Sequence, residues 1–158
     1  LVYIGTCLFE GTNVSEGRGT TQPFQTIGAP WIDAEKLARD LNDMGLKGVK
    51  FRPHYFTPTF SKHEGELCRG VQVHVRDRET IEPYKVGVAI VDNLARNSEQ
   101  FEFLPPYNEG GRQFFDLLAG TNKLRESILD GTVDKFLEGL DAGLEAFEQI
   151  REKYIIYR

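Results

Sequence analysis

The chain has little of several residue types, and each shortage argues against a class of protein. Two cysteines among 158 residues are too few for a disulfide scaffold, and their separation is too long for a zinc knuckle. Acidic residues outnumber basic ones by 24 to 19, and the basic residues form no cluster, which argues against a nucleic-acid-binding protein. No apolar run approaches the roughly 20 residues that span a bilayer, so we expect no membrane span.

The remaining composition is typical of one globular domain. Hydrophobic residues make up 40% and charged residues 27%, which is enough for a core of its own, so we treat residues 1–158 as a single domain. The chain starts at Leu1 without a signal-like pattern, and we expect further residues upstream. Cys7 and Cys68 both have apolar neighbours, and we expect buried free thiols rather than a bridge between them.

Three stretches predict β-strands. The apolar residues within 2–9 predict a short strand, continuous or interrupted. Apolar and basic residues alternate over 49–52, and Pro53 marks an edge strand or the end of the pairing. Valines alternate with polar residues over 71–75, which is the clearest strand pattern. The aromatic, proline-broken segment 54–67 predicts a long loop, and such length often signals a binding role.

Helical signals are stronger in the rest of the chain. Asp33 is a suitable N-cap for a helix that continues to Asn42, and Pro83 suits the first turn of a helix that ends near Asn97. Further helices are predicted at residues 114–118, after Thr121 and after Thr132. The last is the longest, and its apolar stripe consists of Phe136, Leu140, Leu144, Phe147 and Ile150. Residues 154–157 are expected to form a final strand or a packed tail. We therefore expect an α+β domain with a small mixed sheet covered by helices.

One segment carries most of the chemically useful side chains. Residues 10–20 contain glycines, small hydroxyls, carboxylates, an amide and a guanidinium, with almost no apolar side chain, so the segment is a solvated loop or a site. Glu10, Asn13 and Arg18 supply an acid or acceptor, an amide and a cationic fork, which suit a polyhydroxylated ligand with a negative group. The Gly-Arg-Gly triplet is not a dinucleotide fingerprint, because Gln22 stands where the third glycine is needed.

Histidines and cysteines predict neither a metal site nor a nucleophile. His54, His63 and His74 do not cluster in the sequence, and Cys7 lies in a predicted apolar strand where a thiolate is disfavoured. We therefore expect no metal and no cofactor. What remains is a set of carboxylates beside an amide, an arginine and aromatic rings, which is typical of glycoside hydrolysis or glycan binding.

Two aromatic residues are candidates for stacking on a sugar. Trp31 is the only tryptophan, and Tyr55 lies in the predicted long loop. Ordinary burial is the alternative for Trp31. For Glu10 and Arg18, the alternative to a ligand contact is an ion pair that rigidifies the loop.

The run CLFEGTNVSEGRGT at residues 7–20 closely resembles the exo-β-N-acetylmuramidase (NamZ-like) family of bacterial peptidoglycan glycosidases. The likeness covers nearly the whole chain and continues at residues 23–24, 27–31, 56–58, 68–71, 115–120 and 151–154. The resemblance implies the C-terminal domain of a two-domain protein whose N-terminal, Rossmann-like domain is absent from this chain. It also implies an active site between the two domains, release of terminal N-acetylmuramic acid from cell-wall fragments, and an extracytoplasmic location.

The resemblance also suggests roles for individual residues. Glu10 is the candidate second catalytic acid, while the family's proposed catalytic carboxylate has no match in this chain. The lactyl carboxylate of the sugar would give Arg18 a bidentate partner. The residues expected to bind substrate are Asn13, Arg18, Thr20, Trp31 and Tyr55. We expect the fragment alone to be inactive. The alternative is a non-catalytic module that binds cell-wall glycan or a partner protein, with a Gly-rich loop that is a rigid turn.

Overall fold

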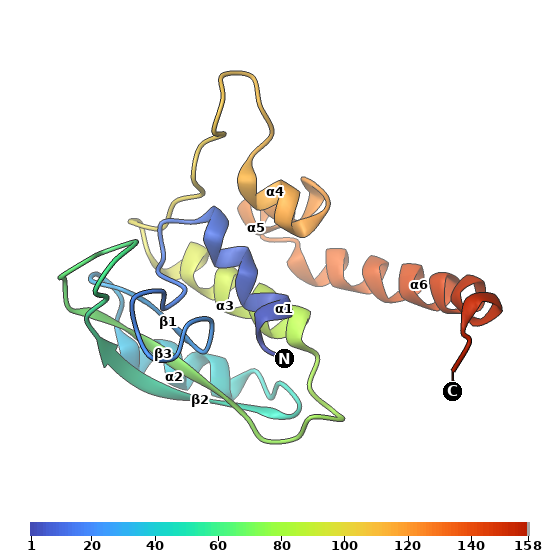
Figure 1. Cartoon of the computed structure of the whole chain (residues 1–158), viewed down its shortest axis with the longest axis horizontal. Coiled ribbons are helices and arrows are strands. Elements are labelled where there is room, and N and C mark those ends of the chain that lie inside the picture. The colour runs from blue at the N-terminus through green and yellow to red at the C-terminus, as the bar shows by residue number, and fades with distance from the viewer. Residues whose placement is uncertain (158) are drawn as a thin grey trace.

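The computed structural model describes residues 1–157 as a small antiparallel sheet with helices packed on it (Figure 1). The elements are, in order, α1 (Tyr3–Thr6), η1 (Cys7–Gly11), β1 (Thr26–Ala29), α2 (Ala34–Asp43), β2 (Val49–Phe56), β3 (Cys68–Val75), α3 (Pro83–Asn97), α4 (Phe114–Ala119), α5 (Lys123–Asp130), α6 (Val133–Arg151) and η2 (Glu152–Tyr154). The predicted α+β class is confirmed. The sheet, expected to be mixed, is antiparallel throughout.

The sheet has the strand order β1-β3-β2, so β3 is central and β2 is an edge strand. The predicted strands at 49–52 and 71–75 are confirmed as parts of the longer β2 and β3. Pro53 lies within β2 and does not end it, since an edge strand tolerates a missing N–H on its free side. The side chain of Asn42 covers part of that free edge, because its amide exchanges two hydrogen bonds with the backbone of Phe51.

The predicted strand within residues 2–9 is wrong, because this segment is helical in α1 and η1. The reason is a close contact between helix backbones. A Cβ on Gly5 would overlap the carbonyl oxygen of Pro83, and a Cβ on Gly87 would overlap that of Gly5. Leu8 and Phe9 are fully buried in this arrangement. Packing of α1 against α3 therefore overrides the strand preference of the apolar run.

The other helices begin and end near their predicted residues. Asp33 caps α2, accepting a hydrogen bond of 2.9 Å from the backbone N–H of Lys36. The bounds of α3 match the prediction, and α4 stops at Gly120, whose φ is 74°. Helix α2 packs against β2 and β3, and α3 packs against α1 and α2, which encloses the hydrophobic core.

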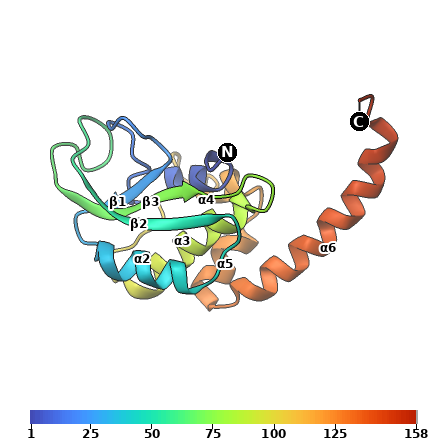
Figure 2. The ribbon, with the colours of Figure 1, turned by 90° about the horizontal axis from the view of Figure 1, so that it is seen from below.

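Helix α6 is the longest, as predicted, but only its first turns join the core. Val133 is buried, whereas the stripe residues Leu144, Phe147 and Ile150 are exposed. Figure 2 shows α6 extending away from the rest of the molecule. Residues 154–157 neither pair with the sheet nor pack, because all four side chains are exposed. No helix within residues 1–157 has the length and apolar content to cross a membrane.

Candidate functional site

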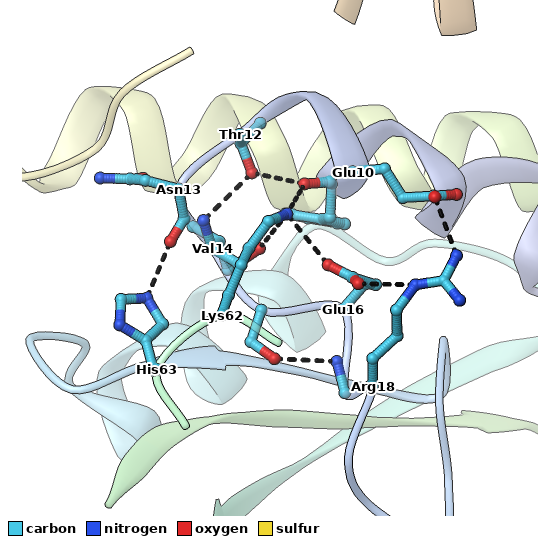
Figure 3. A network of polar contacts seen from close by, with 11 residues as sticks. Glu10, Thr12, Asn13, Val14, Glu16, Arg18, Lys62 and His63 are labelled. Atoms are coloured by element: carbon cyan, nitrogen blue, oxygen red, sulfur yellow. Dashed lines mark hydrogen bonds and ion pairs between the residues drawn. The ribbon is translucent and has the colours of Figure 1, made fainter. Parts of the chain in front are cut away.

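Four charged side chains from two loops and η1 form one network, which we call the polar cluster: Glu10, Glu16, Arg18 and Lys62 (Figure 3). Arg18 Nη2 lies 2.9 Å from Glu10 Oε2, and Arg18 Nε lies 3.0 Å from Glu16 Oε1. Lys62 Nζ lies 3.0 Å from Glu16 Oε2. Two cations thus face two carboxylates, and the cluster is electrically balanced.

The polar cluster has a buried part and an accessible part. The side chain of Glu16 is 3% exposed and that of Lys62 is 20% exposed, whereas Arg18 is 42% exposed. Burial lowers the pKa of Lys62, and the nearby Glu16 carboxylate opposes this effect. The hydrogen bond from Arg18 to Glu10 raises the pKa of the guanidinium. Glu16 and Lys62 are therefore structural, while Glu10 and Arg18 form the solvent-facing edge.

Lys62 also connects the loop to the rest of the fold. Its Nζ donates hydrogen bonds to the carbonyl oxygens of Phe9 at 2.7 Å and Val14 at 3.2 Å. The carbonyl of Asn13 lies 2.8 Å from Nε2 of the neighbouring His63. Residues 54–56, predicted as the start of the long loop, belong to β2 instead, because their backbone pairs with β3. The remainder of the predicted loop holds the Gly-rich loop in place.

The polar atoms of Asn13 and Thr20 are used within the protein. The Asn13 amide donates to the carbonyl of Gln100 at 2.6 Å and accepts from the N–H of Glu102 at 3.0 Å. Thr20 Oγ1 donates to the Gly17 carbonyl at 2.7 Å and accepts from the N–H of Gln22. Both side chains shape the loop, and their role as ligand-binding residues stays a prediction.

Glycine is required at two positions of this loop. Gly17 and Gly19 have φ values of 81° and 82°, which side chains rarely adopt. A Cβ on Gly19 would also lie 2.6 Å from the carbonyl oxygen of Phe60. The carbonyl of Gly19 accepts two hydrogen bonds from Thr59, so the two loops are in backbone contact. The Gly-rich segment therefore packs closely against the segment 57–67.

The two aromatic candidates meet in a different place, a hollow of about 440 Å³. The residues that line the Trp31–Tyr55 hollow are Trp31, Ile32, Asp33, Ala34, Tyr55, Leu67 and Arg69. The register of the sheet explains this grouping. Arg69 on β3 lies opposite Tyr55 on one side and opposite Ala29 on the other, and Trp31 follows two residues after Ala29.

The chemistry of this hollow suits a sugar with a negative group. Two rings offer apolar faces, and Asp33 offers carboxylate oxygens, one of which caps α2. The Tyr55 hydroxyl lies 3.3 Å from Glu35 Oε1. Arg69 has no hydrogen-bond or ion-pair partner for its guanidinium within residues 1–157 and is exposed, so it is available to an anion.

A second hollow of similar volume, about 430 Å³, lies at the start of the chain and the end of β3. Its lining residues are Leu1, Val2, Gln25, Val73, His74, Val75 and Arg78. This set offers no carboxylate and no large aromatic ring. We therefore take the Trp31–Tyr55 hollow as the better candidate for a glycan.

The predicted site residues fall into two groups. Glu10 and Arg18 form the ion pair that was the structural alternative, and they do not line the hollow formed by Trp31 and Tyr55. A role of either group in binding substrate stays a prediction. Sequence reasoning missed Glu16, Lys62 and Arg69. For Arg69 a signal existed, since an arginine two residues before a clear strand lies on the same sheet face as the alternating valines.

No cluster of three metal-binding side chains occurs within residues 1–157. Cys7 and Cys68 are free thiols, as expected, although Cys7 is only half-buried. Burial raises the pKa of Cys68 to about 11, and burial also raises the pKa of Cys7. Neither thiol is therefore suited to nucleophilic chemistry at neutral pH.

A family model, a curated relative and two solved structures each match this chain over nearly its whole length. The family model described as exo-beta-N-acetylmuramidase NamZ, C-terminal, matches residues 1–157. The peptidoglycan beta-N-acetylmuramidase NamZ of Bacillus subtilis strain 168 is 46% identical over 158 residues, a match that covers 99% of this chain and 37% of that protein.

Two crystal structures of DUF1343 family proteins from Bacteroides fragilis are similar to this fold. One has a TM-score of 0.82 at 26% identity, and the other has a TM-score of 0.69 at 29% identity. Each match covers 99% of this chain but only 41% and 40% of the solved chains, so the relatives are more than twice as long. The chain belongs to the family of the C-terminal domain of the exo-β-N-acetylmuramidase NamZ.

Proposed function

We propose that this chain is the substrate-shaping domain of a peptidoglycan glycosidase that releases terminal N-acetylmuramic acid from cell-wall fragments. Family membership and the B. subtilis relative, a peptidoglycan β-N-acetylmuramidase, support this proposal. The chain forms one wall of a cleft, and the main catalytic carboxylate lies on polypeptide outside these residues. The 158-residue chain alone therefore binds glycan weakly and turns over no substrate.

The observation that carries the proposal is that Arg69 lines the same hollow as the aromatic residues Trp31 and Tyr55. An N-acetylmuramyl group has an apolar ring face, several hydroxyls and a lactyl carboxylate. The rings suit the apolar face, Asp33 suits a hydroxyl, and the guanidinium of Arg69 suits the carboxylate. A volume of about 440 Å³ lies in the usual range of small-ligand sites.

Arg18 is less suited to the lactyl carboxylate than Arg69. Its guanidinium already faces Glu10 and Glu16, and both carboxylates would repel a third. Glu10 is 21% exposed beside it, so it keeps its role as a candidate second acid or as an acceptor for a sugar hydroxyl. Arg18 then holds Glu10 in position.

The role of Arg69 is tested in the complete protein with a chromogenic N-acetylmuramyl glycoside. We expect Arg69→Ala to lower kcat/KM about 10- to 100-fold, which is the effect of losing a charge-assisted hydrogen bond. We expect Arg69→Lys to retain part of the wild-type kcat/KM, because lysine keeps the positive charge. The same Arg69→Ala change raises the inhibition constant of N-acetylmuramic acid and leaves that of N-acetylglucosamine, which lacks the lactyl group, unchanged. Arg76→Ala is the matched control, because Arg76 is exposed and lies outside the hollow.

The polar cluster is tested with the same substrate. We expect Glu10→Gln and Arg18→Ala in the complete protein to lower hydrolysis, with Glu10→Gln affecting kcat more than KM. Unchanged hydrolysis in both variants would remove these residues from the site. A complete protein that binds peptidoglycan without any hydrolysis would favour the non-catalytic module instead.

Because the proposed substrate is a cell-wall fragment, we also propose that the complete protein acts outside the cytoplasm. Fractionation of cells that express the complete gene tests this location. Recovery of the protein only in the cytoplasmic fraction would contradict it.

A further inference from the structure

The second half of α6 has an apolar face with no partner in the described chain. Every residue from 141 to 157 is exposed. Leu144, Phe147 and Ile150 are 50%, 58% and 55% exposed, and their spacing places them on one side of the helix together with Tyr154. We call these four residues the α6 stripe. Figures 1 and 2 both show this part of α6 standing away from the domain.

The α6 stripe continues a face that is core at the start of the helix. Val133 is buried, and Phe136 and Leu137 pack against the hydrophobic core. The same apolar periodicity then runs into solvent for more than two further turns. A contiguous exposed apolar face of this kind marks an interaction surface, because leaving it in water is unfavourable.

Two glycines point to a close backbone partner on this side. Gly139 and Gly143 lie inside α6, where glycine disfavours the helix, and a Cβ on either would meet nothing within 4 Å in the described chain. Gly143, Phe147 and Ile150 follow the i, i+4, i+7 spacing of one helix face. Elsewhere in this protein, glycines in helices serve close packing, since Gly5 and Gly87 bring α1 and α3 into backbone contact.

The charges of α6 argue against a second copy of the helix as the partner. Its acidic residues recur every three or four positions and form one row: Asp134, Glu138, Asp141, Glu145 and Glu148. Asp141 pairs with Lys85 of α3 at 3.1 Å, so the acidic residues that follow it are the ones a partner would meet. Only Lys135 and Arg151 are basic within the helix. Two such helices side by side would bring like charges together, whereas a partner with a basic rim would complement them.

We propose that the α6 stripe docks on the polypeptide that the complete protein carries outside these 158 residues. This chain spans 37% of the B. subtilis relative and 41% and 40% of the two B. fragilis chains, so those proteins have more than enough additional chain to cover the helix. Their matches cover 99% of this chain, and α6 therefore belongs to the shared architecture. The docking surface is an apolar groove with a basic rim, whose backbone approaches Gly139 and Gly143. This inference concerns assembly, so it does not depend on the proposed sugar chemistry.

Amide hydrogen exchange of residues 142–157 tests the docking in two proteins, the 158-residue chain and the complete protein. We expect fast exchange in the 158-residue chain, with a monomeric mass by light scattering, and exchange at least tenfold slower in the complete protein. Equally fast exchange in both proteins would overturn the proposal. So would a dimer of the 158-residue chain in which these amides are protected, because a second copy would then cover the stripe.

Gly143→Leu in the complete protein tests the close approach. We expect this change to remove the protection of residues 142–157, although leucine favours a helix more than glycine does. Ala142→Leu is the matched control, because Ala142 is exposed and its side chain projects about 100° away around the helix. The control should keep the protection. Retained protection in Gly143→Leu would contradict a backbone contact at this position.

Discussion

Lys62 and Glu16 form an ion pair with 3.0 Å between Nζ and Oε2, although 46 residues separate them in the sequence. The pair joins the segment after β2 to the Gly-rich loop. Because only 3% of the Glu16 side chain is exposed, its charge depends on protein partners rather than on water. The shape of the loop that presents Glu10 and Arg18 therefore depends on a contact made by a distant residue.

We expect Lys62→Met to destabilise the protein by about 3–5 kcal/mol, since it leaves Glu16 buried with one cation fewer. Urea unfolding of the 158-residue chain measures the change in the free energy of unfolding. Lys36→Met is the control, because Lys36 pairs with Asp40 on the surface and such pairs contribute about 0–1 kcal/mol. Equal losses of unfolding free energy in the two variants would show that the Lys62–Glu16 pair contributes no more than a surface ion pair.

We expect Gly5→Ala to destabilise the protein by about 1–3 kcal/mol or more, because a Cβ would separate α1 from α3. Gly139→Ala in the 158-residue chain should have the opposite effect and stabilise α6 by up to about 1 kcal/mol, since nothing described lies near that Cβ. Thermal unfolding of both variants measures whether each change lowers or raises the Tm. An unchanged or raised Tm in Gly5→Ala would contradict the packing of α1 on α3, and a lowered Tm in Gly139→Ala would contradict the open space around that position.

We expect the free energy of unfolding to decrease as the pH is lowered, over a pH range set by the pKa of His54. Burial lowers the pKa of His54, and Arg52 and His74 lower it further. The unfolded chain then binds a proton at a higher pH than the folded protein does, so stability is lost as the pH falls from above 6.5 through the lowered pKa. Urea unfolding between pH 7.5 and pH 5 should show this slope, and His54→Gln should flatten it. An unchanged slope in His54→Gln would assign the effect to other groups.

We expect the thiol of Cys68 to resist alkylation in the folded protein. Its pKa is about 11 through burial, and its side chain is fully buried. At pH 8, roughly one thiol in a thousand would be ionised, and that thiolate would have no access to reagent. Mass spectrometry after iodoacetamide treatment, with and without denaturant, measures this protection. Rapid modification of Cys68 under native conditions would mean that β3 opens locally.

Most elements could be predicted from the sequence because their signals are local. Asp33 caps α2, Pro83 begins α3 and Gly120 ends α4, and each of these effects depends on the residue itself and its immediate neighbours. The alternating valines of β3 also required no distant contact to be seen. Gln72 within the same strand was predicted on a polar face, yet it is buried. Its amide is satisfied there, since it accepts a hydrogen bond from Arg52 and donates one to Gln22.

The candidate site could be predicted only in part. Its residue types and the Gly-rich loop were visible in the sequence, and so was the alternative of an ion pair between Glu10 and Arg18. The sequence did not show that the candidate residues lie in two separate places. Trp31 and Tyr55 come close to Arg69 only through the register of the three strands.

By itself, the sequence determined the α+β class, the Asp33 cap of α2, the approximate ends of the helices, and the loop that concentrates polar groups, because backbone preferences and hydrophobic periodicity act over a few residues. Only the tertiary structure decided that residues 3–11 are helical, that Lys62 forms an ion pair with the buried Glu16, and that α6 extends from the domain with its apolar face uncovered. These features depend on contacts between residues far apart in the chain, and no local preference encodes such contacts.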